Sequence, residues 1–305
     1  MATRQISLFD TFLMLTLITF WGSSFIVVKI ALNEGLTPIA IATFRFLTAG
    51  GLFIIALFIE KKRNRNYRLH VEKKDVPTLL ILAFTGVTFF FTAQYTGIDM
   101  AGPSIAAIFV CLLSPIIITV FSIKIFKEKL NQKQIFGIGT AAVGTFIVTV
   151  GGTLSLPINN REFFLGSLIL LATPVLWAAY SLLGKKTIEK YNPFLVVAYV
   201  TILGGFSLIP FSLAENSFKQ IFTMNLNSWL AVIYLSSICS LLGYYIWFST
   251  IKKVGAALTS SFLFAEPFIT VLLAVTLPQI GEKLTAPILA GGLLIFTGVY
   301  LITKK

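Results

Sequence analysis

The feature that most constrains this chain is a succession of apolar runs, each about 20 residues long, separated by short polar loops. A helix needs about 20 apolar residues to cross the ~30 Å hydrocarbon core of a bilayer. Only 12% of the residues are charged, about half the share found in soluble globular domains. We therefore predict an all-α integral membrane protein with ten transmembrane helices, at Leu8–Leu32, Pro38–Ile59, Thr78–Ile98, Ser104–Phe126, Ile135–Gly151, Phe163–Gly184, Phe194–Leu213, Trp229–Ile251, Ala256–Leu277 and Ala286–Thr303.

The charges of the loops predict how these helices are oriented. If the N-terminus is cytoplasmic, 19 of the 24 lysines and arginines fall in cytoplasmic segments and 3 in external ones. Basic residues accumulate in the cytoplasmic loops of membrane proteins. The pattern favours a multi-pass protein of the cytoplasmic membrane with both termini in the cytoplasm. Orientation in the lipid bilayer also explains the net charge of +12 without a nucleic-acid partner.

The two halves of the sequence repeat each other at an offset of about five spans. Matching pairs are Trp21 with Trp177, Gly102 with Gly255, Pro115 with Pro267, Glu128 with Glu282, and Gly144 with Gly298. Because the number of spans per repeat is odd, the second half must cross the membrane in the opposite sense. Residues 1–151 and 152–305 are thus predicted to be two inverted five-helix repeats around a central cavity. Many secondary transporters have this architecture, with the substrate site near the membrane midplane.

These residues resemble the EamA family of the drug/metabolite transporter superfamily over nearly the whole chain. The marks that carry the resemblance are Trp21-Gly22-Ser23-Ser24-Phe25, Lys29, Arg45-Phe46, Ser114-Pro115, Glu128, Glu266-Pro267 and Glu282. The resemblance implies ten helices around a central cavity that opens alternately to the two sides. It also implies amino acids, other metabolites or toxic compounds as substrates, often exported. The second half departs from the pattern at Ala178-Ala179, where a Gly-Ser pair is expected, which weakens any claim that both halves bind substrate alike.

Glu266 is the sharpest candidate for chemistry. It lies about ten residues from either end of the predicted ninth span, which is ~15 Å deep at 1.5 Å per residue. A charged, unpaired carboxylate at that depth costs a few kcal/mol, so the side chain must face a cavity, pair with a cation or be protonated. One interpretation is a site for a substrate amine or a coupling proton. The other is a structural hydrogen bond to backbone freed beside Pro267.

Lys29 and Arg45 are the two basic residues inside the predicted spans. Arg45 could neutralise a substrate carboxylate, reach the outer headgroups or tie helices together. For Lys29, near the end of its span, snorkelling of the ammonium to the interface is the stronger interpretation. Pro115 and Pro267 each remove a helical hydrogen bond and free a carbonyl group, that of Leu263 in the second case. They are candidate hinges, or else fixed kinks that serve packing.

Aromatic side chains recur on helix faces that the repeat relates. Phe91, Gln94 and Tyr95 share one face of the third span by i, i+3, i+4 spacing, and Tyr244 and Trp247 occupy equivalent places in the eighth. They either line a cavity for amphipathic substrates or are lipid-facing and core aromatics. Other candidates for the cavity lining, from the first, fourth and sixth spans, are Trp21, Ser24, Ser114, Trp177 and Tyr180.

Several kinds of function lack the residues they need. The sequence has no glycine-rich phosphate loop through which ATP could drive it directly, and His70 is its single histidine, so no Ser/His/Asp set can form. No Cys/His cluster is present to bind a metal, and no cofactor is expected. Cys111 and Cys239, inside apolar runs, are interpreted as small packing residues.

We therefore interpret the chain as a secondary transporter of small metabolites, with an exporter of amino acids or related amphipathic compounds as the leading hypothesis. Protons are a candidate coupling ion. One chain supplies both inverted halves, so a monomer is expected to function. The alternatives are a carrier for nucleotide sugars or phosphate esters, which would want several intramembrane cations, a channel-like facilitator, and a membrane enzyme.

Overall fold

The computed structural model describes residues 6–151, 160–276 and 284–303, and every regular element in these ranges is a helix. The α-helices are α1 (Leu8–Asn33), α2 (Pro38–Arg63), α3 (Val76–Ala83), α4 (Phe89–Ala101), α5 (Pro103–Ile108), α6 (Ser114–Phe126), α7 (Gln132–Gly151), α8 (Arg161–Leu170), α9 (Ala172–Lys190), α10 (Pro193–Ala214), α11 (Leu226–Tyr234), α12 (Gly243–Val254), α13 (Ala256–Ser260), α14 (Glu266–Val275) and α15 (Ala286–Thr303). Short 3-10 or π-helical segments precede or join several of them, at Lys73–Asp75, Phe84–Thr88, Phe109–Leu113, Ser217–Phe222, Leu235–Leu242 and Ser261–Ala265.

Nine helical rods within the described ranges are long and apolar enough to cross a membrane. Five of them combine consecutive helices, such as α3 with α4 and α8 with α9. The nine correspond to nine of the ten predicted spans, so the multi-pass, all-helical character of the protein is confirmed. The tenth prediction, Ile135–Gly151, falls on α7, a helix of 20 residues that is not among the nine. The number ten therefore stays a prediction.

Local sequence signals fix several helix starts. The side chains of Ser7, Thr37 and Asn192 accept hydrogen bonds from first-turn backbone N–H groups of α1, α2 and α10, as N-cap residues do. Pro38 and Pro193 then open α2 and α10, where a missing N–H costs nothing. These signals explain why the predicted starts of the first, second and seventh spans agree with the structure to within one residue.

Equivalent places in the two halves interrupt the helices in the same way. Gly102 separates α4 from α5 with a φ of 90°, and Gly255 separates α12 from α13 with a φ of 98°. Backbone of this kind is unstrained only for glycine. Each break therefore needs the glycine that the sequence repeat supplies.

The two matched prolines lie inside spanning rods, at the points where the helix type changes to α. Pro115 is in the first turn of α6 after a π-helical stretch, and Pro267 is in the first turn of α14 after a 3-10 stretch. The prediction that Pro267 leaves the Leu263 carbonyl free is wrong, because the N–H of Glu266 donates to that oxygen. The tighter turn of a 3-10 helix, with its i to i+3 bonds, satisfies the carbonyl locally.

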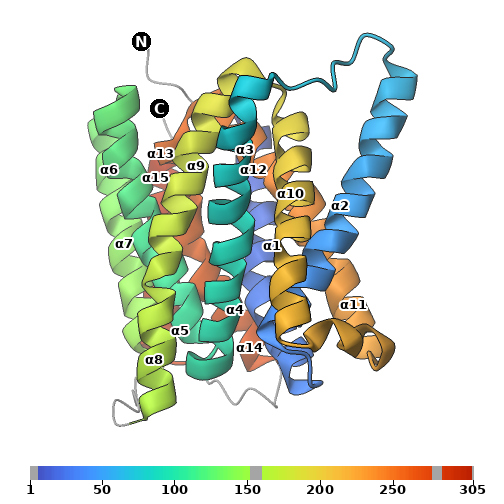
Figure 1. Ribbon diagram of the computed structural model, residues 1–305. Helices are drawn as coiled ribbons and strands as arrows, with labels where there is room; N and C mark the ends of the chain where they lie inside the picture. The colour runs from blue at the N-terminus through green and yellow to red at the C-terminus, as the bar shows by residue number, and fades with distance from the viewer. Residues whose placement is uncertain (1–5, 152–159, 277–283, 304–305) are drawn as a thin grey trace.

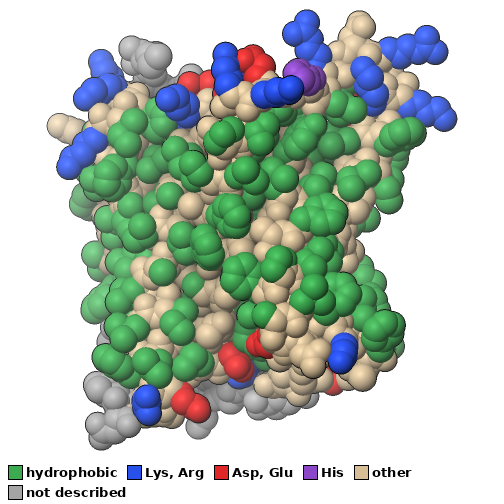
Figure 2. Space-filling view, viewed as in Figure 1, with side chains coloured by type: hydrophobic (Ala, Val, Ile, Leu, Met, Phe, Trp, Pro, Cys, Tyr) green, Lys and Arg blue, Asp and Glu red, His purple; other side chains and the backbone are tan. Residues whose placement is uncertain are grey.

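The connections that the repeat relates lie at opposite ends of the bundle. Figure 1 shows the α2–α3 connection at the upper end and the α10–α11 connection at the lower end. Lysine and arginine side chains gather at the upper end, and hydrophobic side chains cover the flank between the two ends (Figure 2). A flank of this composition faces the hydrocarbon of a bilayer, with the charged groups in the headgroup region and the water beyond it.

Helices α7 and α15 approach each other backbone to backbone through glycines. A Cβ atom added to Gly144 would lie 2.6 Å from the carbonyl oxygen of Gly291, and one added to Gly137 would lie 2.7 Å from that of Gly298. Real Cβ atoms do not come so close to a carbonyl oxygen. The four glycines, which belong to the sequence repeat, are thus required by this contact, as is common where membrane helices associate.

We expect Gly144→Val to lower the melting temperature of the purified protein by several degrees, because overpacking a tight contact costs about 1–3 kcal/mol. Thermal unfolding in detergent measures the effect. Gly139→Val on the same helix is the matched control, since no atom lies within 4 Å of its Cβ position. Equal melting temperatures for the two variants would contradict the close contact between α7 and α15.

Candidate functional site

A small cavity lies inside the bundle among side chains from both halves of the chain. It leaves about 30 Å³ for the centre of a water-sized sphere, which is room for roughly two water molecules. The bundle is therefore contracted around the cavity, which is too small for an organic solute in this conformation. The lining side chains are Trp21, Ser24, Phe25, Arg45, Phe90, Phe91, Gln94, Val110, Trp177, Tyr244, Leu263 and Glu266.

Glu266 brings a carboxyl group to the cavity wall. It begins α14, and its side chain is buried with 2% of its surface exposed. The Sγ atom of Cys111 lies 2.9 Å from Oε2 and donates to it, while Oε1 has no partner among the described residues. The carboxyl group takes no part in the hydrogen bond to the Leu263 carbonyl, which the backbone N–H of Glu266 donates. One carboxyl oxygen, Oε1, is therefore left without a hydrogen-bond partner in the described chain.

Arg45 places a cation at the same cavity. Its Nε donates to the Ser240 hydroxyl at 2.8 Å and its Nη1 donates to the Tyr95 hydroxyl, and its guanidinium carbon lies 4.5 Å from the centre of the Phe91 ring. Arg45 is 2% exposed, so the interpretation that it reaches the headgroups is wrong. It ties helices together and also faces the cavity. No acidic side chain pairs with it in the part of the chain that the structure describes.

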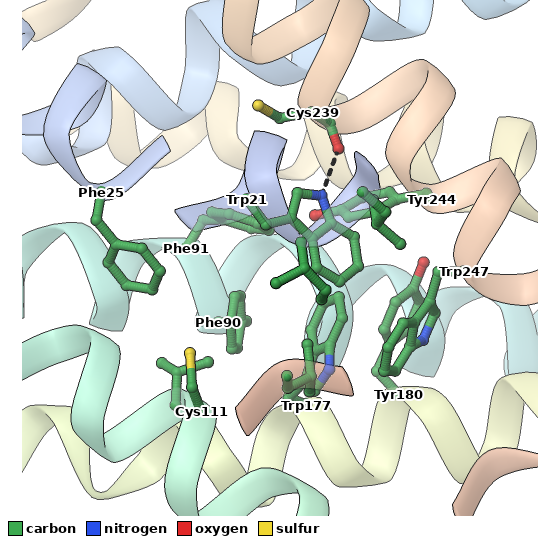
Figure 3. Close-up of a cluster of buried hydrophobic side chains, with 14 of the residues drawn as sticks. Trp21, Phe25, Phe90, Phe91, Cys111, Trp177, Tyr180, Cys239, Tyr244 and Trp247 are labelled. Atoms are coloured by element: carbon green, nitrogen blue, oxygen red, sulfur yellow. Dashed lines mark hydrogen bonds between the residues drawn. The ribbon is translucent and has the colours of Figure 1, made fainter. Parts of the chain in front are cut away.

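An aromatic cluster forms much of the wall around these charges (Figure 3). The ring of Trp21 lies 5.4 Å from those of Trp177 and Trp247 and 5.9 Å from that of Tyr244, measured between ring centres. Its indole N–H donates to the carbonyl of Cys239 at 2.9 Å, which fixes the orientation of the ring. Edge-on and tilted contacts of this kind hold aromatic side chains in defined positions, so the apolar wall is preorganised.

Three buried polar atoms of lining residues have no hydrogen-bond partner within the described ranges. They are Oε1 of Glu266, the indole nitrogen of Trp177 and the hydroxyl of Tyr244. Leaving a buried polar group unpaired costs about 1–3 kcal/mol, and native proteins seldom do so without cause. The three atoms are thus free to hydrogen-bond water or a ligand that reaches them.

The residues proposed from sequence divide into four groups. Trp21, Ser24, Arg45, Phe91, Gln94, Trp177, Tyr244 and Glu266 line the cavity together. Tyr95, Ser114, Tyr180 and Trp247 are buried but do not belong to the lining, and Pro115 and Pro267 lie in the first turns of α6 and α14. Lys29 is partly exposed and lies away from the lining.

Four lining residues were missed by the sequence analysis, namely Phe25, Phe90, Val110 and Leu263. Val110 and Leu263 are separated by the offset that relates Gly102 to Gly255, so the repeat could have identified them as a pair. Phe90 and Phe25 gave no separate signal, because phenylalanine is abundant throughout this chain, at 29 residues.

Glu128 joins three helices at the lysine-rich end of the bundle. Its carboxylate pairs with Lys185 of α9 and accepts hydrogen bonds from the backbone N–H groups of Ala256 and Ala257 at 2.9 and 3.0 Å. Both charged side chains are largely buried, with 13% of Glu128 and 10% of Lys185 exposed. The Glu128 clasp, as we call these four residues, thus links the end of α6 in the first half to the second half.

A polar contact joins the two halves at the opposite end. The Glu34 carboxylate, just after α1, accepts hydrogen bonds from the side-chain amides of Asn225 and Asn227, the latter at 2.9 Å. These two bonds lower the pKa of Glu34 below its usual value. The Glu34 clasp, formed by these three residues, also joins the two halves. The cavity therefore lies in a bundle that is fastened at both ends.

A bundle of membrane-spanning helices around a cavity lined by aromatic and charged side chains is compatible with a membrane transporter. The chain belongs to the EamA-like transporter family, whose model matches residues 9–150 and 164–304. The resemblance seen in the sequence is thereby confirmed. The name of the family indicates a transporter and not an enzyme.

Relatives align along nearly their whole length. An uncharacterized transporter of Archaeoglobus fulgidus is 28% identical, over 93% of this chain and 94% of that protein. Proteins named probable amino-acid metabolite efflux pump are 25% identical in Salmonella typhimurium and 24% identical in Escherichia coli, each over 96% of this chain and 94% of the relative. A solved crystal structure shares the fold with a TM-score of 0.72 at 20% identity, covering 96% of this chain and 98% of the other.

Proposed function

We propose that this protein is a secondary transporter that exports amino acids or closely related amphipathic metabolites across the cytoplasmic membrane. The observation that carries the proposal is a pair of opposite charges at one buried cavity, Glu266 with an unpartnered oxygen and Arg45 without an acidic partner in the described ranges. A zwitterion complements both, with its ammonium on Glu266 and its carboxylate on Arg45. The aromatic wall receives its apolar side chain.

Energetics favour such a substrate over an uncharged one. A buried charge that lacks a counter-charge costs several kcal/mol, and Glu266 and Arg45 are both almost fully buried. A zwitterion that contacts both relieves that cost at the two places together. Phosphate esters and nucleotide sugars are less well matched, because Arg45 is the single cation in the cavity lining of the described chain.

Alternating access is supported by the relation between the halves. In this proposal residues 1–151 and 152–305 are inverted five-helix repeats, with α7 as the tenth spanning helix. The equivalent glycine breaks, and the equivalent connections at opposite ends of the bundle (Figure 1), support it. Since the lysine-rich end is the cytoplasmic one by the positive-inside rule, both termini are cytoplasmic. One chain then contains all that is needed, and a monomer functions.

Export of amino acids also agrees with the names of the relatives from Salmonella typhimurium and Escherichia coli. In this proposal transport is driven by the proton gradient or by the substrate gradient. Glu266 is the group that couples proton movement to substrate movement, because a proton and a substrate ammonium compete for the same carboxylate oxygen.

Counterflow in proteoliposomes tests the proposal. Vesicles loaded with unlabelled L-phenylalanine or L-leucine should accumulate the labelled amino acid in a saturable manner, faster than unloaded vesicles do. An imposed pH gradient should raise the flux further, and equal flux without the gradient would reject the proton as the coupling ion. Uptake that rises linearly with concentration and is not stimulated by internal substrate would contradict a carrier and favour a channel-like facilitator.

A further inference from the structure

We propose that Cys111 is a positioning residue for Glu266, and that its thiol sets how strongly the cavity prefers substrates with an ammonium group. The inference deepens the proposed function and rests on it, since it concerns the carboxylate that receives the ammonium. It replaces the interpretation of Cys111 as a packing residue.

The geometry assigns the two carboxylate oxygens different tasks. The thiol of Cys111 donates to Oε2 of Glu266 at 2.9 Å, whereas Oε1 is buried with no partner in the described chain, and Glu266 is one of the residues that line the cavity. Both residues are buried, at 0% and 2% exposure. The thiol is thus the described side chain that fixes how the carboxyl group turns, and the orientation that it fixes leaves Oε1 for the cavity.

The backbone around both residues supports a specific placement. Cys111 lies in the π-helical segment Phe109–Leu113, directly before α6. A π-helical turn has wider spacing than an α-helix and is frequent at functional sites. Glu266 lies where a 3-10 segment becomes α14. Two irregular segments from different halves of the chain therefore bring this thiol and this carboxylate together.

A thiol suits the task because it is a weak donor. It can orient a carboxylate while leaving most of the negative charge for a second partner. A lysine or arginine in its place would neutralise Glu266 and compete with a substrate ammonium. The cavity would then lose the complementarity that a zwitterion needs.

The other cysteine provides a natural control. Cys239 is equally buried, but its thiol lies 3.4 Å from the backbone carbonyl of Phe20. Figure 3 shows the two cysteines on opposite sides of the aromatic cluster. Substitution of Cys239 removes a buried thiol of the same size without touching Glu266.

Binding of three matched probes tests the inference, measured through tryptophan fluorescence in purified protein. The probes are L-phenylalanine, 2-phenylethylamine, which lacks the carboxylate, and 3-phenylpropionate, which lacks the ammonium. We expect Cys111→Ala to raise Kd about fivefold for the two ammonium probes, the effect of one ordinary hydrogen bond. The Kd of 3-phenylpropionate should stay within about twofold, which is the resolution of such a comparison. Cys111→Ser, which keeps a donor, should restore the wild-type values, and Cys239→Ala should change none of them.

An equal change for all three probes would overturn the inference, because it would indicate general damage to the cavity. Values for Cys111→Ser that match those of Cys111→Ala would overturn it as well. If wild-type protein binds neither ammonium probe, the proposed function fails, and the preference assigned to the thiol fails with it.

Infrared spectroscopy gives a second readout that needs no substrate. The S–H stretching bands are assigned with Cys111→Ser and Cys239→Ser, each of which should remove one band. Glu266→Ala should shift the Cys111 band toward that of a weakly bonded thiol and leave the Cys239 band in place. A Cys111 band that does not shift in Glu266→Ala would overturn the inference even if amino acids are transported. Failure of this inference and failure of the proposed function can therefore be distinguished.

Discussion

Glu266→Gln is expected to reduce transport of ammonium-bearing substrates ~100-fold or more while the protein remains folded. Removing one partner of a buried charge pair costs about 3–5 kcal/mol, and each 1.4 kcal/mol is a factor of ten. The amide has nearly the shape of the carboxyl group and can still accept from the Cys111 thiol, so packing is preserved. It also removes a buried charge, and the melting temperature of the substrate-free protein should stay the same or rise.

Initial rates of L-phenylalanine counterflow in proteoliposomes measure this effect, with thermal unfolding of the same preparations. Glu162→Gln is the control, because Glu162 is exposed at the start of α8 and should transport at the wild-type rate. The ammonium-free probe 3-phenylpropionate should bind to Glu266→Gln at least as well as to wild type, since a repulsive charge is gone. Near-normal counterflow by Glu266→Gln would show that the carboxylate serves structure alone.

Much of the fold could be predicted from the sequence because the bilayer imposes a length and a polarity on each helix. Nine predicted spans match helices of the structure, and caps such as Thr37 and prolines such as Pro38 mark where they begin. The π-helical stretches could not be predicted. Phe84–Thr88 reads as the middle of an ordinary apolar span, but in the structure this π-helical turn packs closely against α9. At Gly86 a Cβ atom would meet the ring of Tyr180 at 2.3 Å.

The residues of the candidate site that could be predicted are charged residues deep inside a predicted membrane span, where charge is unusual. Glu266 and Arg45 stood out because charged groups inside a membrane are costly, and both line the cavity. The partners of these residues did not stand out. Cys111 lies 155 residues from Glu266 in sequence, and their contact depends on how two helices are rotated, which a hydropathy pattern does not encode.

Loss of the Glu128 clasp is expected to open the lysine-rich end of the bundle. Glu128 pairs with Lys185 and with the first N–H groups of α13, and we expect these bonds to break when that end opens. Breaking a largely buried ion pair costs several kcal/mol. If the substitution destabilises the closed state by about 1.4 kcal/mol and leaves the open state unchanged, the ratio of open to closed molecules rises tenfold. Glu128→Gln should therefore shift the protein toward a state open at the lysine-rich end.

A cysteine at the cavity reports the shift. In a background carrying Cys111→Ser and Cys239→Ser, Ser24→Cys places one thiol on the cavity wall, and membrane-impermeant thiol reagents are added to one side of the vesicles. Glu128→Gln should raise the labelling rate from the lysine-rich side about tenfold, in line with that population shift. The control is Lys186→Met, because Lys186 is exposed and lies next to Lys185 in α9. In this variant the cysteine at position 24 should be labelled at the same rate as in the background protein.

The opposite clasp makes this prediction a two-sided one. Glu34→Ala removes the acceptor for Asn225 and Asn227 and should raise labelling from the other side, by less than Glu128→Gln because Glu34 is exposed. If the two clasps are gates of one cavity, each variant should raise the labelling rate from the side of its own clasp. It should also lower the labelling rate from the opposite side, because a molecule that is open at one end is closed at the other. If both variants increased labelling from both sides, the clasps would merely stabilise the fold, and the cavity would lie in a loosened bundle instead of between two gates.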